Sequence, residues 1–267
     1  MERKWKFAAA VAAILLVAPS AVLAQQPRQL GGHPNLNGIW QAMNTADWNI
    51  EPHDAAPAPA APELVGALGA VPAGLGVVEG GKLPYLPAGQ AQRDMNKASA
   101  PKADPEAACY LPGIPRATYI DHPFQIVQAG DGDILMAYEY AAANRTVFMQ
   151  KVEVPPIDTW MGTSYGSWEG NTLKVITLAQ NGMTWLDRVG DYVSPNATVT
   201  ERFTLKDADH IIYEVTVDDP TVYSKPWKMS MPLYRRTEPN AQLLDFRCVP
   251  FADLLIYGDL LPKQPAK

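Results

Sequence analysis

Cysteine, histidine and the motifs of cofactor chemistry are scarce in this sequence. Its 267 residues include 2 Cys and 4 His, and the histidines are scattered along the chain. A scaffold built on many disulfides is therefore excluded, and no zinc-binding motif is present. The sequence also has no phosphate-binding glycine loop, no dinucleotide fingerprint and no His-Glu-x-x-His. Gly162-Thr163-Ser164-Tyr165-Gly166 places a serine between two glycines, but in a strand-turn context without a following helix, so we expect no hydrolase nucleophile there. We expect neither a metal nor another cofactor.

Positive charge is also in short supply, with 22 Lys and Arg against 28 Asp and Glu and a net charge of -6. Loss of the first 24 residues would remove three cations and one anion and leave a net charge of -8. A protein this acidic has no general attraction for nucleic acid or for anionic lipid. We therefore expect no nucleic-acid partner and no membrane partner after the N-terminal segment is removed.

The N-terminus carries the longest apolar run of the chain. A short basic start, Met1 to Lys6, precedes the apolar run Phe7 to Val17, and Val22-Leu23-Ala24 has small or short side chains where a signal peptidase reads. A membrane anchor is the alternative, but the run reaches Pro19 and is shorter than the ~20 residues that a bilayer span needs. The pattern predicts a signal peptide cleaved after Ala24 and a periplasmic or secreted protein.

The two cysteines fit that compartment. In an oxidising space Cys109 and Cys248 can form one bridge that closes a long loop. Two separate buried thiols are the alternative.

Proline, alanine and glycine dominate the segment from 51 to 107. Of its 57 residues, 9 are Pro, 14 are Ala and 7 are Gly. Pro and Gly at this density interrupt both helices and central strands, so we predict an irregular arm. Its apolar residues suit it to lie along a groove of the main domain. We divide the chain into a signal peptide (1–24), a first strand region (25–50), the arm (51–107), a β-barrel domain (108–260) and a tail (261–267).

Short runs of β-branched and aromatic residues recur after Cys109, with turn signals such as Asp131-Gly132 and Asn181-Gly182 between them. We expect strands at Leu36 to Met43, Phe124 to Gln128, Ile134 to Tyr140, Arg145 to Val152, Thr163 to Glu169, Thr172 to Leu178, Ala197 to Leu205, His210 to Asp218, Pro226 to Arg235 and Leu243 to Arg247. The pattern predicts an all-β fold, an antiparallel up-and-down meander of about 8 to 10 strands. Closing into a barrel removes the edges of such a sheet. A sandwich, or a sheet wrapped by the arm, is the alternative.

Gly38-Ile39-Trp40 is similar to the Gly-x-Trp of the first strand in lipocalins and related calycin barrels. The resemblance implies that Trp40 closes one end of a barrel and that an Arg from a late strand packs on its ring. Arg235, Arg236 and Arg247 are the candidates for that Arg.

A second resemblance covers nearly the whole chain after the signal. Its motifs are CYLPGIPRATY (109–119), PFQIVQ (123–128), WMGTSYGSWEGNTL (160–173) and TWLDRVG (184–190). In combination they resemble a widespread family of exported bacterial proteins of unknown function. The resemblance implies a secreted β-rich protein and no assigned reaction. Relatives tend to carry His-Ser where this sequence has Val193-Ser194, so no role is carried over for that histidine.

Alternation along the strands identifies buried charges. Glu201 shares the apolar face of its strand with Val199 and Phe203, so it is expected to point into the barrel. Glu139 is a weaker case of the same kind, and Arg145 is a plausible internal partner for either glutamate. Such a pair is either the acid-base machinery of a site or a structural ion pair inside the barrel.

His122 is the fourth catalytic candidate, because a histidine titrates near neutral pH and this one lies close in sequence to Arg116 and Tyr119. A surface histidine before a proline is the alternative.

Two functions from different classes follow. The first is binding of a small apolar or aromatic molecule in an internal cavity lined by aromatic residues. The second is a cofactor-independent isomerase, cyclase or lyase that uses Glu201 with Arg145, Glu139 or His122 in the same cavity. The candidate ligand-binding residues are Trp40, Tyr119, Tyr138, Trp160, Trp168, Trp185, Asp187 and Trp227.

Overall fold

A computed structural model describes residues 29–57, 70–100, 102–246 and 248–250. The predicted signal peptide, residues 25–28, part of the predicted arm, Arg247, residues 251–260 and the whole predicted tail (261–267) lie outside these ranges. The elements in chain order are β1 (Gln29–Leu30), β2 (His33–Pro34), β3 (Gly38–Ala42), α1 (Pro87–Ser99), α2 (Arg116–Tyr119), β4 (Phe124–Gln128), β5 (Ile134–Tyr138), the 3-10 turn η1 (Tyr140–Ala142), β6 (Asn144–Phe148), β7 (Thr163–Glu169), β8 (Thr172–Leu178), β9 (Thr198–Leu205), β10 (His210–Asp218) and β11 (Trp227–Arg235).

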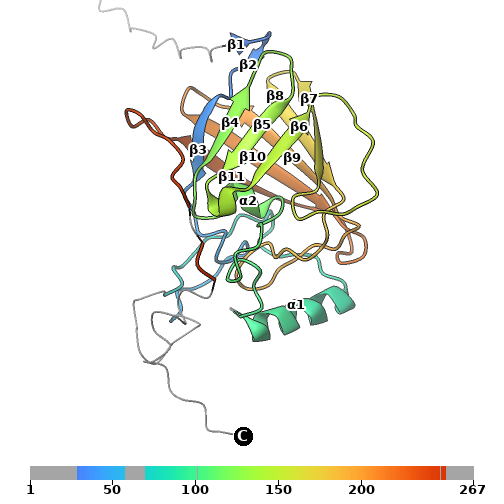
Figure 1. Ribbon diagram of the computed structural model, residues 1–267. Helices are drawn as coiled ribbons and strands as arrows, with labels where there is room; N and C mark the ends of the chain where they lie inside the picture. Colours follow the sequence, from blue (N-terminus) through green and yellow to red (C-terminus); the bar gives the residue numbers. More distant parts are fainter. Residues whose placement is uncertain (1–28, 58–69, 101, 247, 251–267) are drawn as a thin grey trace, which may run out of the picture.

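Nine strands form a closed barrel in the order β10-β11-β3-β4-β5-β6-β7-β8-β9 (Figure 1). The predicted barrel is therefore confirmed, and β3 from the first strand region completes it between β11 and β4. Burial alternates along β9 and β10, as a strand with one face in the core requires.

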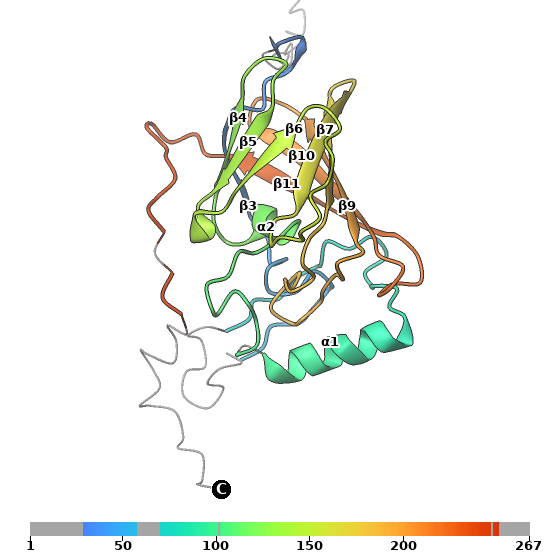
Figure 2. The ribbon, with the colours of Figure 1, turned by 45° about the vertical axis from the view of Figure 1, so that its right-hand side comes forward.

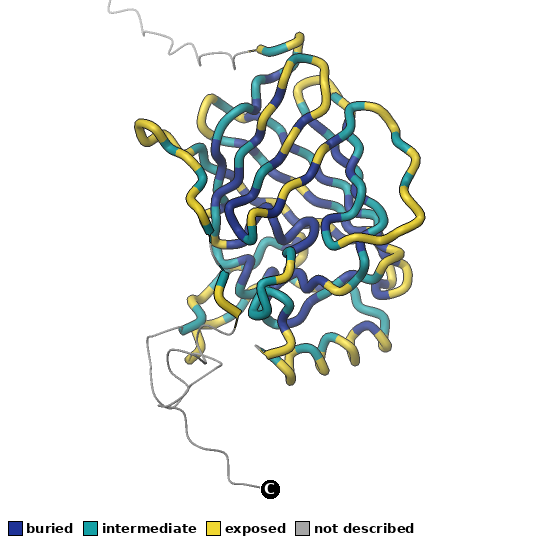
Figure 3. The backbone as a smooth tube through the Cα atoms, in the orientation of Figure 1, coloured by how far each residue is buried: buried dark blue, intermediate teal, exposed yellow. Residues whose placement is uncertain are grey.

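The prediction of a purely antiparallel meander is wrong at one seam. β6 and β7 run parallel and pair only through Val147 with Ser164 and Phe148 with Tyr165. The connection from 149 to 162 crosses from one end of the barrel to the other, and its middle is exposed (Figure 3). A parallel pair needs such a crossover, whereas a tight turn would have made the pair antiparallel.

Two further corrections concern segments outside the barrel strands. The predicted irregular arm contains α1, a helix of 13 residues that begins at Pro87. Proline suits the first turn of a helix, and the residues from 90 to 99 include neither Pro nor Gly. The predicted strand at Leu243 to Arg247 is wrong as well, because residues 243–246 form no strand, and the last strand among the described residues ends at Arg235.

The barrel has two unlike ends (Figures 1 and 2). We call one the hairpin end, since it carries β1, β2 and the tight turns after β4, β7 and β9. We call the other the loop end, since it carries α1, α2 and the long connections 43–57, 70–115, 179–197 and 219–226. Cys109 and Cys248 form a disulfide with a Cα–Cα distance of 5.7 Å, which confirms the predicted bridge.

Near the hairpin end, Trp40 is fully buried and the guanidinium of Arg235 lies 4.2 Å from its ring centroid. Arg235 is thus the late-strand Arg that the Gly-x-Trp resemblance implies. It also donates to the carbonyl of Asn37 at 2.5 Å. Gly38 is required here, because a Cβ on it would overlap the Arg235 guanidinium.

Large side chains fill the barrel interior. Phe124, Phe203, Tyr213 and Met229 have no exposed surface, and Tyr138 is 2% exposed. Side chains with so little accessible surface do not face a water-sized void. The interior at their level is therefore a packed core.

Candidate functional site

The first candidate is the pair that alternation predicted, Arg145 on β6 and Glu201 on β9. Arg145 Nη1 lies 2.6 Å from Glu201 Oε2, and Nη2 lies 3.0 Å from Oε1. Tyr213 on β10 donates its hydroxyl to Oε1 at 2.7 Å. We call Arg145 and Glu201 the barrel pair.

The barrel pair is sealed in the core. Glu201 has no exposed surface and Arg145 is 5% exposed. Burial by itself lowers the pKa of Arg145, but the Glu201 carboxylate outweighs it and holds that pKa above its ordinary value. The predicted internal cavity is not found at this level. Glu201 is paired with Arg145 in a closed core, which favours the structural ion pair of the two alternatives.

His122 and Glu139 form a separate pair at the loop end. His122 Nδ1 lies 3.3 Å from Glu139 Oε1, and the other Glu139 oxygen accepts the backbone N–H of Leu244 at 2.8 Å. The Phe246 ring lies 4.5 Å from the His122 ring. Because the segment carrying Leu244 and Phe246 lies against both residues, the structure brings them together without opening a cavity for a substrate.

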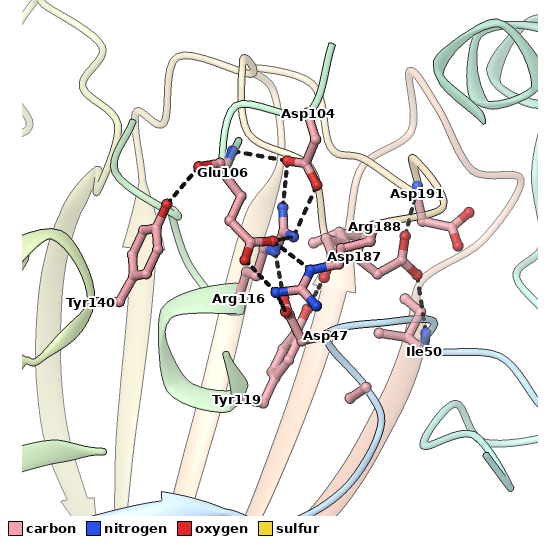
Figure 4. Close-up of polar contacts among 12 residues, drawn as sticks. Asp47, Ile50, Asp104, Glu106, Arg116, Tyr119, Tyr140, Asp187, Arg188 and Asp191 are labelled. Carbon is pink, nitrogen blue, oxygen red and sulfur yellow. Dashed lines mark hydrogen bonds and ion pairs between the residues drawn. The ribbon is translucent and has the colours of Figure 1, made fainter. Parts of the chain in front are cut away.

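A second cluster of buried charges lies at the loop end, centred on Arg116 of α2 (Figure 4). Arg116 is 2% exposed. Its Nε donates to Asp47 at 2.8 Å, and its Nη1 and Nη2 donate to Asp104 at 2.9 and 3.1 Å. It also pairs with Glu106. One guanidinium therefore binds three carboxylates from two different connections.

Arg188 joins the same cluster from the connection between β8 and β9. Its Nη2 lies 2.5 Å from Glu106 Oε1 and 3.1 Å from Asp47 Oδ2. Its guanidinium also lies 4.3 Å from the ring centroid of Trp48. We call Asp47, Asp104, Glu106, Arg116 and Arg188 the loop-end network. It holds three carboxyl groups and two guanidinium groups.

Burial and the two guanidinium groups shift the pKa values of two carboxyl groups of the loop-end network in opposite directions. Burial raises the pKa of Asp47 to about 6, against the attraction of Arg116. Burial also acts on Glu106, but Arg116 and Arg188 outweigh it and lower that pKa to about 2. One carboxyl group of the network is thus poised to take up a proton in mildly acidic solution.

Asp187 and Asp191 form a buried carboxyl pair beside the network. Asp187 accepts the backbone N–H groups of Ile50 at 3.0 Å and of Asp191 at 3.1 Å. Burial, followed by repulsion from Asp191, raises the pKa of Asp187 well above its usual range. Asp191 accepts hydrogen bonds from Tyr85 at 2.8 Å and from Arg93 at 3.1 Å. The sequence prediction that Asp187 binds a ligand is not matched by its surroundings, since it has no exposed surface.

An open groove with a volume of about 770 Å³ lies beside the loop-end network. Asp104 belongs to both, because it lines the groove and binds Arg116. The groove has walls from α1, from segment 102–110, from Trp160 and from the connections 182–195 and 221–222. Its size lies within the range of small-molecule sites.

Aromatic side chains and one methionine line this groove. Tyr110 and Trp160 stack with ring centroids 4.8 Å apart and an interplanar angle of 9°. Trp185 and Tyr192 are joined by a backbone bridge and also line the groove. Tyr110 is 52% exposed and Met183 is 59% exposed. Large apolar side chains left exposed together are typical of a binding surface.

The other predicted ligand-binding residues are spread over the molecule. Trp40 and Tyr138 belong to the core, and the Tyr119 hydroxyl donates to the Leu186 carbonyl at 2.7 Å beneath the loops. Trp227 packs edge-on against Tyr223. Trp168 stacks on His33 near the hairpin end. Of the eight predicted residues, Trp160 and Trp185 line the groove.

Sequence reasoning missed the loop-end network and the groove. Arg116 was the available signal, since it is a charged residue among apolar neighbours in Ile114 to Ile120. Its partners are 69, 12 and 10 residues away, and no periodicity links them. Their convergence follows only from the packing of the connections around α2.

Comparison with protein-family models gave no match, and neither did comparison with curated proteins or with solved structures. In the part of the chain that the structure describes, no helix is long and apolar enough to cross a membrane. No cluster of three or more potential metal ligands occurs among the described residues. The resemblance to an exported bacterial family stays a prediction.

Proposed function

We propose that this protein binds one small, flat aromatic molecule in the loop-end groove. The observation that carries the proposal is the groove itself, where the stacked Tyr110 and Trp160 rings meet Met183 and Trp185 in an open volume of about 770 Å³. Offset stacking on such rings adds about 1 kcal/mol to the burial of apolar surface. Tyr110 and Met183 are largely exposed and so present apolar surface to a ligand, and Asp104 in the groove lining is held by Arg116.

The proposal moves the ligand from the barrel interior to the barrel end. Interior side chains occupy the space that a lipocalin-like ligand would take. The Trp40–Arg235 contact supports a relationship to such barrels. The binding role is proposed for the connections, which is where many folds place their sites.

A fluorescence titration tests the proposal. The probe is N-phenyl-1-naphthylamine, an uncharged aromatic fluorophore. We expect saturable binding at one site, and we expect Trp160→Leu to weaken it about tenfold, equal to about 1.4 kcal/mol. Trp168→Leu is the matched control, because Trp168 also stacks on a neighbouring ring but lies outside the groove. Equal affinity for both variants, or no saturable binding by the wild type, would overturn the proposal.

We also infer that the protein is exported. The basic start and apolar run at the N-terminus support this, as does the Cys109–Cys248 disulfide, which persists in oxidising compartments. Intact-mass measurement of the protein recovered from the periplasm or medium is the test, with Gln25 expected as the first residue. Recovery of the uncleaved chain from the cytoplasm would contradict it.

A further inference from the structure

Helix α1 is docked in an unusual way. Gly89 is the one residue of Pro87–Ser99 that is buried, and Arg93 and Asn96 are partly buried. These three positions are spaced by four and three residues, so they lie on one face of the helix. Most helices dock through an apolar stripe, whereas this one docks through a glycine, a guanidinium and an amide. Little apolar burial therefore holds it.

Polar contacts take the place of that apolar stripe. Arg93 Nε lies 3.1 Å from Asp191 Oδ1, and Asn96 Nδ2 donates to the Gly190 carbonyl at 2.9 Å. At Gly89 the helix comes so close to the connection after β10 that a Cβ would lie 2.5 Å from the Val222 carbonyl oxygen. Asp191 has no exposed surface, whereas Arg93 reaches it from the partly exposed helix.

The chain before the helix is anchored more firmly. The N–H of Leu86 donates to the Val222 carbonyl at 2.9 Å. The Tyr85 ring packs 4.8 Å from the Tyr223 ring, and its hydroxyl donates to Asp191. After the helix, Asp104 is fixed by Arg116. The segments before and after the helix are therefore firmly attached to the rest of the protein, whereas the helix itself is held by few contacts.

The same helix forms one wall of the groove through Ala88, Gly89, Gln92 and Asn96. We propose that α1 is a movable wall that controls access to the groove, and that Arg93 with Asp191 is its latch. The control of access rests on the proposed function, because it requires that a ligand enters the groove. The latch itself is a property of the ligand-free protein. Elements with few buried apolar contacts open more readily than the core to which they are attached.

Hydrogen exchange on the ligand-free full chain tests the latch. Arg93→Met should speed exchange of the α1 amides about tenfold, the loss expected when one charge-assisted hydrogen bond is removed, and leave the barrel amides unchanged. Lys97→Met is the matched control, since it removes a cation from the exposed side of the same helix. Gly89→Val is a second variant that forces the helix outward by overlap with Val222 and should have a similar effect.

The ligand arm measures dissociation of N-phenyl-1-naphthylamine by stopped flow. Arg93→Met should increase the dissociation rate severalfold, and Lys97→Met should not. Unchanged exchange of the α1 amides in both Arg93→Met and Gly89→Val would overturn the latch, whether or not the groove binds the probe. Unchanged dissociation in a protein whose α1 exchanges faster would overturn control of access. Failure of the wild type to bind the probe would count against the proposed function and leave the exchange result to decide the latch.

Discussion

The barrel pair and the loop-end network are both buried ionic clusters, yet they differ in charge balance and in surroundings. Arg145 on β6 and Glu201 on β9 neutralise each other and are buried in the barrel. The loop-end network sets two guanidinium groups against three carboxyl groups, and one of its carboxyl groups, Asp104, lines an open groove. The first cluster has the features of a structural element, whereas the second adjoins a surface on which a ligand could bind.

The largest effect is expected from breaking the barrel pair. Arg145→Met leaves the Glu201 carboxylate buried without a cation and should lower the free energy of unfolding by about 4 kcal/mol. Adding Glu201→Gln should restore part of the loss, because the new amide is neutral and still accepts the Tyr213 hydroxyl. Urea denaturation of both variants measures this. A double variant as unstable as the single one would contradict the assignment of the pair as a neutralised structural unit.

Removing the disulfide tests the loop end in a different way. The Cys109–Cys248 bridge spans a sequence separation of 139 residues, so Cys109→Ser with Cys248→Ser should cost about 3 to 4 kcal/mol. The bridge adjoins Tyr110 and the segment that carries Glu106. Hydrogen exchange should therefore increase first at the loop end and spare the barrel pair. Uniform loosening of the whole barrel would show that the two clusters are not independent.

The pH dependence of stability should separate the two clusters further. Asp47 has a pKa raised from 3.8 to about 6 in the folded protein. Its contribution is therefore present below pH 4 and is lost as the pH rises through 6, by at most about 3 kcal/mol. Glu106 has a pKa lowered to about 2, so its contribution is present above pH 4.5 and is lost as the pH falls through 2.

Asp47→Asn should make the decline between pH 4 and 6 smaller, by at most about 3 kcal/mol, and keep the loss at lower pH. The part of the decline that comes from Asp187, whose pKa is also raised, should remain. Denaturation midpoints measured across pH 2 to 7 check this, with Asp207→Asn as a surface control. A decline of equal size in the wild type and in Asp47→Asn would contradict the role of Asp47.

The smallest effect is expected at Arg188, which is 28% exposed at its side chain. Arg188→Gln should cost about 1 kcal/mol at low salt, from the lost ion pairs and the lost contact with Trp48. The cost should shrink as salt is added. The cost of Arg145→Met should not, because the barrel pair is shielded from ions. Equal salt dependence of the two variants would remove the distinction in exposure.

Prediction from sequence succeeded where the chain alternates regularly. The strands Phe124–Gln128, Thr163–Glu169 and His210–Asp218 have the predicted bounds, because each is a short run with β-branched or aromatic residues between turn signals. The Arg145–Glu201 pair was also within reach, since alternation places both side chains on the buried face. The parallel seam between β6 and β7 was not, because a long connection gives no signal of its direction.

The average composition of the segment from 51 to 107 led to a wrong prediction for its second half. The 57 residues of the predicted arm are rich in Pro and Gly as a whole, but α1 occupies a stretch in which both stop after Gly89. Its polar docking stripe carries no hydrophobic period, so the usual helix signal was missing.

The sequence by itself determined the β-rich fold class, the one possible pair of disulfide partners and the buried position of Glu201, because strand patterns and residue scarcity can be read along the chain. Only the tertiary structure decided that Glu201 is sealed, that Arg116 gathers three carboxylates, and that Tyr110, Trp160 and Trp185 meet at one groove. Those residues come from connections that have no periodic pattern. Their positions follow from how the connections pack at the loop end of the barrel.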